Sequence, residues 1–374
     1  MIQIHFERLR RLGLSPALAQ HAVACADQHG PSPTDLQLMR LTEVHRETVR
    51  LHDGQSEHSA RVQPRLLRQL AEPIADEAFA TAPAAATLAV GDWVWASATG
   101  EAWVHARVPP ATHIQRRDAD GRRHAVVSNV DTALLVMGLD DDFNPRRLER
   151  YLTLVQASGV MPVIVLTKAD VLAPTPGALE ARVASLLCRM PAHIDVLAVD
   201  GTDSTTARRL SPYLGLGQTL VLLGSSGAGK STLTNTLLGA PVQDTGAVRL
   251  HDSRGKHTTT SRSLHALPGG ACVIDTPGLR ALRPDVDAAT LAATFDDIES
   301  LAAHCRFRDC HHHDEPGCAV REGVHSDRLL NYQKLLRESR RDTLSAIERQ
   351  QQVASWKARG KATRAWMKLK RGEE

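Results

Sequence analysis

The stretch Thr219-Leu-Val-Leu-Leu-Gly-Ser-Ser-Gly-Ala-Gly-Lys-Ser231 is an apolar segment followed by a glycine-rich loop. Residues 224–231 match the pattern G-x-x-x-x-G-K-[ST] at every fixed position. The pattern after the loop predicts a helix over residues 232–238, which Gly239 would end. Because a strand, this loop and a helix follow one another, the stretch predicts a phosphate-binding loop in an α/β domain. The competing interpretation is a glycine-rich turn that binds nothing.

The residue types of the loop suit a nucleotide bound through its phosphates. Glycines let backbone N–H groups face phosphate oxygens, and the helix N-terminus adds the positive end of its dipole. We expect Lys230 to reach the β- and γ-phosphates and Ser231 to hold Mg²⁺. The nucleotide-binding residues predicted in this stretch are Gly224, Ser225, Ser226, Gly227, Ala228, Gly229, Lys230, Ser231 and Thr232.

The motif Thr167-Lys-Ala-Asp170 indicates which base the site reads. It follows residues 163–166, a short apolar run that predicts a buried strand. The motif resembles the guanine-reading [NT]-K-x-D motif of GTPases, in which the aspartate accepts two hydrogen bonds from guanine. Adenine offers no such donor pair, so the site would disfavour ATP. We therefore expect Thr167, Lys168 and Asp170 to contact a guanine nucleotide. Taken alone, the tetrapeptide also fits an exposed strand end.

The order of the motifs differs from that of an ordinary GTPase. Downstream of the phosphate loop, His257-Thr-Thr-Thr260 is placed like a first switch, and Asp275-Thr-Pro-Gly278 resembles the D-x-x-G second switch. We expect Asp275 near Mg²⁺ and the Gly278 N–H on the γ-phosphate. Since the guanine motif comes before the phosphate loop, the sequence predicts a circularly permuted domain. Its second switch leads directly into a C-terminal module.

The C-terminal module contains a metal-ligand pattern. The spacing Cys-x4-Cys-x-His-x5-Cys joins Cys305, Cys310, His312 and Cys318. Three thiolates and one imidazole form a closed tetrahedral set, which suits one structural Zn²⁺ per chain. Spacing alone does not choose between His312 and its neighbours His311 and His313. The alternative is a reduced cluster without metal in a histidine-rich loop.

Together these motifs resemble the RsgA family of bacterial, circularly permuted GTPases that depend on the small ribosomal subunit. The resemblance runs from about Val90 to the basic C-terminal segment, and its matching segments are 129–133, 167–170, 224–231, 255–260, 275–278, 305–310 and 315–321. It implies an N-terminal OB-type β-barrel, a circularly permuted P-loop GTPase domain and a C-terminal zinc-binding helical domain. It also implies a GTPase that acts in late maturation of the 30S subunit, with hydrolysis of GTP to GDP and phosphate stimulated by that subunit.

Changes of pattern along the 374 residues indicate a helical piece followed by a small β-domain, and the resemblance implies what each domain is. We expect a helical extension over 1–40, an OB-fold RNA-binding domain over 41–120, the GTPase domain over 121–290 and the zinc-binding domain with a basic helix over 291–374. The pair Asp53-Gly54 predicts a hairpin, and 91–96 and 102–106 predict strands. Residues 73–87 are rich in Pro and Ala and predict a loop. The tryptophans Trp93, Trp95 and Trp103 are candidates for stacking on bases, although barrel core is the favoured interpretation.

Charge and cysteine usage limit the cellular setting. The formal net charge is only +3, but residues 328–371 concentrate Lys and Arg, so a local patch that contacts 16S rRNA is expected. Arginines 116, 117, 122 and 123 surround a turn that fits either an RNA contact or a solvated linker. No apolar run approaches a membrane span, and singly scattered cysteines fit a reducing cytosol. We expect a cytoplasmic monomer without a membrane, with the 30S subunit, 16S rRNA and GTP or GDP as partners.

The catalytic group is the least defined part of the site. In Ras-like GTPases a Gln after D-x-x-G orients the attacking water, and here that position is Leu279. An aliphatic side chain cannot hold water, so intrinsic hydrolysis should be slow. His257 is the candidate for orienting water, and the alternative is that it contacts RNA or stabilises the switch. Thr259 is the favoured switch ligand of Mg²⁺, with Thr258 and Thr260 as rivals.

Two functions of other classes remain open at this point. A P-loop ATPase or kinase would require the motif at 167–170 to be accidental. An RNA-binding scaffold that kept the site but lost turnover is compatible with Thr167 and Leu279. A diverged second copy of the factor also fits the atypical guanine motif.

Overall fold

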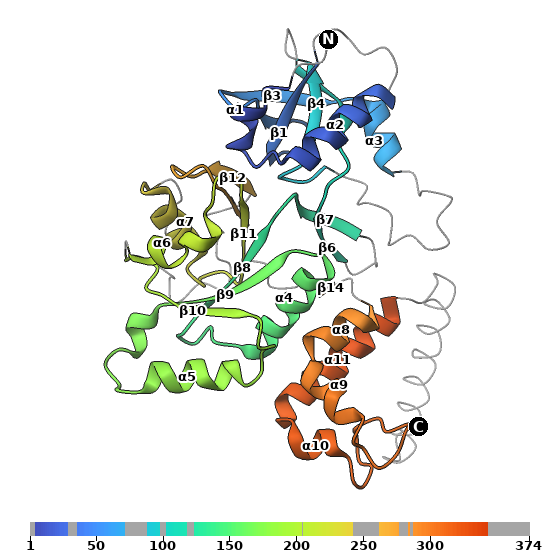
Figure 1. The fold of residues 1–374 in the computed structure, drawn as a ribbon, viewed down its shortest axis with the longest axis vertical. Coiled ribbons are helices and arrows are strands. Elements are labelled where there is room, and N and C mark those ends of the chain that lie inside the picture. The colour runs from blue at the N-terminus through green and yellow to red at the C-terminus, as the bar shows by residue number, and fades with distance from the viewer. Residues whose placement is uncertain are drawn as a thin grey trace, which may run out of the picture.

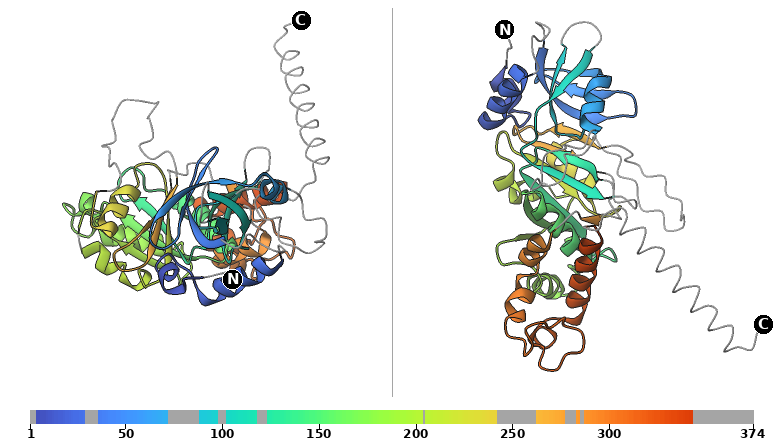
Figure 2. Two further views of the ribbon diagram at one scale, coloured as in Figure 1. Left: turned by 90° about the horizontal axis from the view of Figure 1, so that it is seen from above. Right: turned by 90° about the vertical axis from the view of Figure 1, so that its right-hand side faces the viewer.

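The computed structural model describes residues 4–28, 36–71, 88–97, 102–117, 123–203, 205–241, 262–276, 283–284 and 287–342. Three bodies are stacked along its long axis, namely a β-barrel, a sheet covered by helices and a small helical module (Figure 1). The same stack is seen from the side in Figure 2. No helix among these residues has the length and apolar character needed to cross a membrane.

The N-terminal barrel is a closed antiparallel-rich sheet of five strands. They are β1 (Leu36–Val44), β2 (Val49–His52), β3 (Glu57–Val62), β4 (Trp93–Ser97) and β5 (Ala102–Arg107). They follow the order β1-β2-β3-β5-β4, and β4 pairs back with β1 to close the barrel. The expected hairpin at Asp53-Gly54 is confirmed, because residues 53–56 join β2 to β3. Helix α3 (Pro64–Ala71) follows β3.

The barrel begins earlier than expected. Strand β1 starts at Leu36, ahead of residue 41, because Leu36 and Leu38 already point into the core. The expected loop at 73–87 lies outside the described residues. Trp93 and Trp95 are 0% and 1% exposed, so these two rings belong to the barrel interior and are closed to bases. Trp103 is half-buried.

Helices α1 (Phe6–Arg10) and α2 (Pro16–Gln28) form the predicted N-terminal extension. Ser15 caps α2, since its Oγ accepts a hydrogen bond from the Leu18 N–H at 3.2 Å. The extension packs on the barrel, where Trp95 Nε1 donates to the Ala22 carbonyl at 3.1 Å. It also reaches the central sheet, where the Cys272 thiol contacts the Arg11 carbonyl at 3.4 Å.

Arg40 joins the extension, the barrel and the central sheet. It lies on β1, is 0% exposed, and stacks over the Trp93 ring. Its guanidinium donates to the Leu12 carbonyl of the extension, and at 2.8 Å to both Thr219 Oγ1 and the Asn129 carbonyl. A buried guanidinium is tolerated only with partners, and here each comes from a different segment of the chain.

The central body is a six-stranded, mostly parallel sheet. Its strands are β8 (Thr132–Gly138), β9 (Met161–Thr167), β10 (Asp195–Ala198), β11 (Thr219–Leu223), β12 (Ser263–Ala266) and β13 (Cys272–Asp275). They lie in the order β10-β9-β8-β11-β13-β12, and only β12 runs antiparallel to its neighbour. Strand β9, which leads into the guanine motif, therefore comes before β11, which leads into the phosphate loop, although both lie in one sheet. The predicted circular permutation is confirmed.

Helices cover both faces of this sheet. They are α4 (Pro145–Ala157), α5 (Ala178–Leu187), α6 (Thr205–Arg209) and α7 (Lys230–Leu238). Because side chains alternate along a strand, Leu135 of β8 shares a buried cluster with Leu148 of α4, whereas its neighbour Leu134 shares another with Leu233 of α7. Gly239 ends α7 in the left-handed conformation, as the sequence predicts.

Two connections join the barrel to the central sheet. Strand β12 pairs with β1 through Glu43 and Ser263, so the barrel continues the central sheet. Strands β6 (His113–Arg117) and β7 (Arg123–Ser128) form a hairpin, and the short strand β14 (Arg283–Pro284) pairs with β6. Strand β14 thus lies beside β6 just before the chain enters the C-terminal module.

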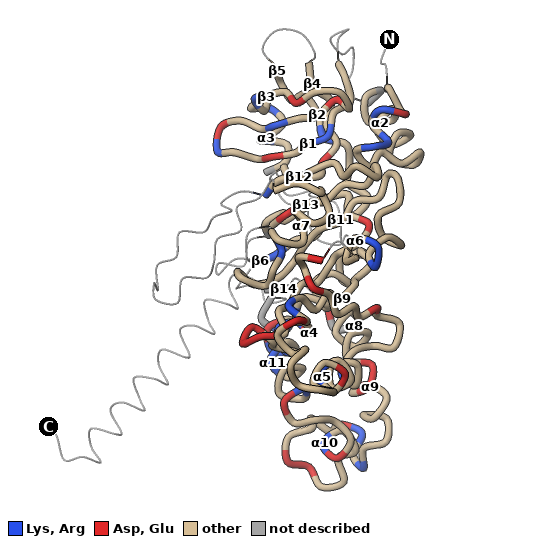
Figure 3. The backbone as a smooth tube through the Cα atoms, turned by 90° about the vertical axis from the view of Figure 1, so that its left-hand side faces the viewer, with Lys and Arg blue, Asp and Glu red and all other residues tan. Residues whose placement is uncertain are grey.

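The C-terminal module consists of α8 (Ala288–Thr294), α9 (Asp296–Ala302), α10 (Ala319–Gly323) and α11 (Ser326–Asp342). Helices α4 and α11 both carry charged residues where the module contacts the central body (Figure 3), and Arg150 of α4 pairs with Glu338 of α11 at 2.6 Å. Glu149 of α4 is 0% exposed and accepts hydrogen bonds from Arg328 at 3.0 Å and Asn331 at 2.6 Å. Arg189 of the segment after α5 approaches the same carboxylate at 2.8 Å. The remainder of the expected basic helix lies outside the described residues.

Candidate nucleotide and metal sites

The phosphate loop leaves the carboxyl end of β11 and enters α7 with the predicted geometry. Gly224 is required there, because a Cβ would come within 2.3 Å of the Val136 carbonyl of the neighbouring strand. Gly229 has φ +88°, the left-handed region that favours glycine. Ser226 and Gly227 are exposed at the tip of the loop, where a ligand can approach their backbone.

Lys230 is folded into this loop. Its Nζ donates to the Ser225 carbonyl at 2.6 Å and to the Gly224 carbonyl at 3.1 Å. Burial lowers the pKa of Lys230 from its ordinary value, while Asp275 and Asp142 oppose that shift. The ammonium therefore sits inside the loop, as expected for a group that meets phosphate oxygens.

Asp275 and Ser231 lie side by side, as a magnesium site requires. The Ser231 hydroxyl donates to Asp275 Oδ2 at 3.4 Å, and Asp275 Oδ1 is buried without a hydrogen-bond partner among the residues that the structure describes. Burial raises the pKa of Asp275, and the charge of Lys230 counteracts this. A buried carboxylate oxygen with no partner, beside a hydroxyl, is the kind of oxygen pair that Mg²⁺ takes from a protein. These two residues fit the ion.

Thr167 ties the guanine motif to the phosphate loop. Thr167 Oγ1 donates to the Ala228 carbonyl at 2.6 Å. A Cβ on Gly229 would lie 3.2 Å from Thr167 Oγ1, so the glycine leaves room for this close approach. A threonine at the first motif position therefore reaches the loop with its short hydroxyl. Threonine at this position, where the motif also allows asparagine, therefore keeps the two motifs connected.

The other two motif residues lie where a base can reach them. Lys168 adopts φ +59°, and Asp170 is exposed in the short helix η1 (Ala169–Leu172). Lys168 Nζ pairs with Asp140 Oδ2 at 2.5 Å. The loop at 199–202 lies beside them, since the Ala169 N–H donates to the Val199 carbonyl at 3.4 Å and the Gly201 carbonyl accepts from Thr236 at 2.6 Å.

The loop between β8 and α4 was not singled out by sequence reasoning. Asp142 Oδ2 accepts a hydrogen bond from the Ser225 hydroxyl at 2.6 Å, and its Oδ1 lies 2.6 Å from Arg147 Nη2. A signal existed, because acidic residues 140–142 directly follow a buried strand, and the carboxyl ends of neighbouring parallel strands share one edge of the sheet. This loop forms a further side of the nucleotide site.

Several predicted site residues lie outside the described part of the chain. They are His257, Thr259 and its rivals Thr258 and Thr260, Gly278 and Leu279. Their roles stay predictions. The two switch segments that hold them connect to described strands, since β12 follows the first and β13 leads into the second.

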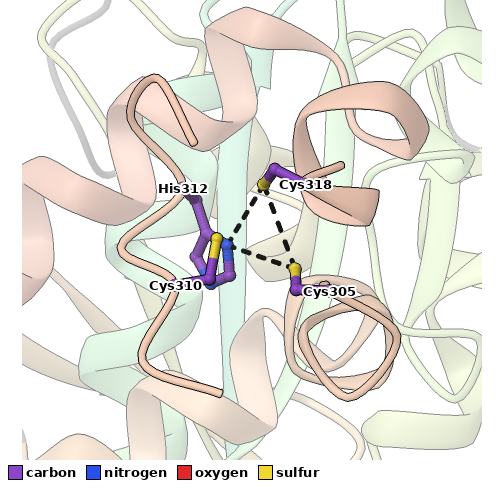
Figure 4. A group of neighbouring side chains, drawn as sticks. All are labelled: Cys305, Cys310, His312 and Cys318. Atoms are coloured by element: carbon purple, nitrogen blue, oxygen red, sulfur yellow. Dashed lines mark hydrogen bonds between the residues drawn. The ribbon is translucent and has the colours of Figure 1, made fainter. Parts of the chain in front are cut away.

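Four candidate metal ligands converge in the C-terminal module (Figure 4). Their donor atoms all lie within 4.8 Å of one another. Cys305 Sγ is 4.0 Å from Cys318 Sγ, and His312 Nδ1 is 3.7 Å and 3.4 Å from these sulfurs. With Zn–S near 2.3 Å, tetrahedral geometry places two sulfurs roughly 3.8 Å apart, so the cluster fits zinc. Cys310 completes the set.

The structure chooses between the three adjacent histidines. Glu315 accepts the backbone N–H of His311 at 3.0 Å and of His313 at 2.8 Å. The backbone N–H of Glu315 itself, followed by those of His311 and His313, lowers the pKa of Glu315 to about 2. His312 lies between them at φ +58° and turns its ring toward the cysteines, whereas His311 and His313 are exposed.

Comparison with known sequences agrees with this geometry. The family model described as RsgA GTPase matches residues 108–284. A protein of Xanthomonas oryzae pv. oryzae named small ribosomal subunit biogenesis GTPase RsgA is 46% identical over 283 residues, covering 74% of this chain and 75% of that protein. A protein of the same name from Xanthomonas campestris pv. campestris is 47% identical over the same shares.

Solved structures resemble the whole arrangement. YjeQ from Thermotoga maritima superposes with a TM-score of 0.54 at 20% identity, covering 81% of this chain and 98% of that one. YloQ, described as a circularly permuted GTPase, has a TM-score of 0.53 at 21% identity, covering 83% and 98%. At these identities the likeness establishes the fold.

Proposed function

The chain belongs to the RsgA GTPase family, and on that premise we propose that it hydrolyses GTP to GDP and phosphate during biogenesis of the small ribosomal subunit. The observation that supports this most is the meeting of three loops at one edge of the central sheet. Thr167 after β9 bonds to Ala228 of the phosphate loop, and Ser231 bonds to Asp275 at the end of β13. One bound nucleotide would therefore contact the segment that reads the base and the phosphate loop, and its Mg²⁺ would lie beside Asp275.

The described residues divide the work of binding. Backbone N–H groups of the phosphate loop and Lys230 take the β- and γ-phosphates, and Asp170 takes the guanine edge. Ser231 and Asp275 would hold Mg²⁺, with Thr259 as a further ligand. When bound, the ion supplies positive charge against the phosphate oxygens.

Nucleotide turnover tests the function directly. We expect slow GTP hydrolysis by the protein alone and an increase of about 10-fold or more with purified small subunits, since activation of GTPases supplies large factors. ATP should not be hydrolysed, and large subunits should not stimulate. Tight GTP binding without stimulation would instead favour an RNA-binding scaffold or a diverged copy.

The variant Asp170→Asn tests which base the site reads. In the same turnover assay, it should shift the preference of the protein from GTP toward XTP, which the same change in an ATPase would not do.

We place His257 as the residue that orients the attacking water. His257→Ala is expected to abolish the stimulated part of hydrolysis while GTP affinity stays within about 2-fold of wild type, because a group that acts only in the transition state does not contribute to ground-state binding. Turnover and equilibrium binding are measured on the same preparation. Loss of GTP affinity, or survival of stimulated turnover, would assign His257 to the switch or to RNA instead.

The remaining expectations form the rest of the proposal. One structural Zn²⁺ per chain is held by Cys305, Cys310, His312 and Cys318. The factor acts late in maturation, as a cytoplasmic monomer that contacts 16S rRNA through the N-terminal barrel and the basic segment after 328. We also keep the division at residues 121 and 291 between barrel, GTPase domain and zinc-binding domain, and move the limit between the extension and the barrel from residue 41 to Leu36, where β1 begins.

A further inference from the structure

We propose that Asp140 is a positioning residue for guanine-nucleotide binding, whose carboxylate holds the Lys168 ammonium so that the lysine stem lies along the face of the base. The inference rests on the proposed function, since it assigns the base to the segment 167–170. It concerns a residue outside the motifs, contributed by the loop between β8 and α4.

The pair is formed between two neighbouring strand ends. Asp140 follows β8 and Lys168 follows β9, and these strands pair in register up to Gly138 and Thr167. Lys168 Nζ lies 2.5 Å from Asp140 Oδ2, and the two side chains are 31% and 33% exposed. Both ends of the pair are therefore accessible at the edge where the nucleotide would bind.

Hydrogen bonds within the loop hold both the carboxylate and the backbone of Asp140 in place. The Asp142 N–H donates to its Oδ1 at 3.2 Å, and the Phe143 N–H donates to the Asp140 carbonyl at 3.0 Å. Gly138 leaves the space for it, because a Cβ there would come within 2.4 Å of Oδ1 and 3.5 Å of the Lys168 Cδ. A residue with a side chain at the end of β8 would therefore collide with the Asp140–Lys168 ion pair.

Ionisation favours the same arrangement. Partial burial raises the pKa of Asp140, but the hydrogen bond from Lys168, the backbone hydrogen bond from Asp142 and the charge of Lys168 together outweigh it, and the pKa lies below its ordinary value. The carboxylate is therefore charged at neutral pH. A free lysine side chain samples many rotamers and must lose them when it packs on a base, whereas a lysine already held at its ammonium loses fewer. Asp140 would therefore strengthen nucleotide binding without touching the nucleotide, because it orders the Lys168 side chain in the free protein.

If Asp140 instead hindered nucleotide binding, removing its charge would raise the affinity rather than lower it. If the ion pair drew Lys168 away from the base, removal of the Asp140 charge would free the lysine and tighten binding. Equilibrium affinity for GDP separates the two roles, because GDP contains the base and the phosphates but does not turn over.

The experiment compares Asp140→Asn with the adjacent Asp141→Asn in the full-length protein, using GDP and IDP. Asp141 is exposed and serves as a matched loss of one carboxylate on the same loop. We expect Asp140→Asn to weaken GDP binding by about 3- to 5-fold, the range of a partly exposed ion pair, and Asp141→Asn to leave it unchanged. IDP should lose the same factor, because the lysine contacts the face of the base, which hypoxanthine shares. Asp140→Glu should recover part of the loss.

Lys168→Ala completes a double-mutant cycle. In its background Asp140→Asn should have no further effect, whereas a general disturbance of the loop would still weaken binding. Unchanged or tighter GDP binding by Asp140→Asn, while Lys168→Ala binds weakly, would overturn this inference alone. If Lys168→Ala also bound GDP like wild type, the assignment of the base to 167–170 would fail as well.

Discussion

His312→Ala is expected to release the metal from the C-terminal module and to unfold that module. Removing a residue that hydrogen-bonds a zinc ligand already weakens zinc affinity by about 10- to 100-fold. Removing the ligand itself should weaken zinc affinity further. The sulfurs of Cys305 and Cys318 belong to the small core around Phe295 and Val320, so the metal and the core form together. Zinc content per chain and protease resistance of residues 287–342 are the measurements.

The two neighbouring histidines provide matched controls. His311→Ala and His313→Ala should keep both the zinc and the protease resistance, since their rings are exposed and Glu315 holds their backbone N–H groups. Nucleotide affinity should be unchanged in all three variants. Loss of metal in His311→Ala or His313→Ala, with metal retained in His312→Ala, would refute the ligand assignment.

Arg328→Met should loosen the same module from the central body by a different route. The Arg328 side chain is 3% exposed and bridges Glu149 at 3.0 Å and Asp297 at 2.6 Å, over the Phe295 ring. Removing one partner of a buried ion pair costs roughly 3–5 kcal/mol, because the other charge stays buried. Arg189 and Asn331 still solvate Glu149, so we expect about 3 kcal/mol, seen as a lower urea midpoint for the C-terminal module.

Two variants make this result specific. Arg321→Met removes a half-exposed arginine that lies 3.8 Å from the fully exposed Asp314, and it should change the free energy of unfolding of the module by less than about 0.5 kcal/mol. Glu149→Leu combined with Arg328→Met should recover part of the loss, because both charges of this buried pair are then gone and Arg189 keeps its ion pair with Asp327 at 2.9 Å. If the double variant were as unstable as Arg328→Met, packing rather than charge would hold the module.

The elements of the nucleotide site could be predicted from the sequence because their signals are local. The strand at 219–223, the loop at 224–231 and the glycine that ends α7 follow one another within one supersecondary unit. The permuted order required only the positions of motifs along the chain. The closed barrel followed from the resemblance, and its hairpin from the pair Asp53-Gly54.

What escaped prediction depends on residues far apart in the chain. Glu149 and Arg328 lie in polar stretches that resemble solvated helix faces, and only tertiary packing buries them together. Asp140 is one of three consecutive acids, and its pairing with Lys168 depends on the neighbouring order of β8 and β9. The choice of His312 depends on a left-handed backbone and on Glu315, neither of which ligand spacing reveals.

The pairing of β12 with the barrel strand β1 also bears on solubility. A sheet edge with unpaired backbone groups is a template for association with other chains, and proteins keep such edges short or covered. At one side of the central sheet the edge strand β10 has only four residues, and at the other side β1 of the barrel pairs with β12 at Ser263. The barrel therefore occupies part of the edge of the strand that follows the first switch and shortens the edge that is open to strand exchange. This protection ties the N-terminal domain to the GTPase domain independently of any contact with RNA.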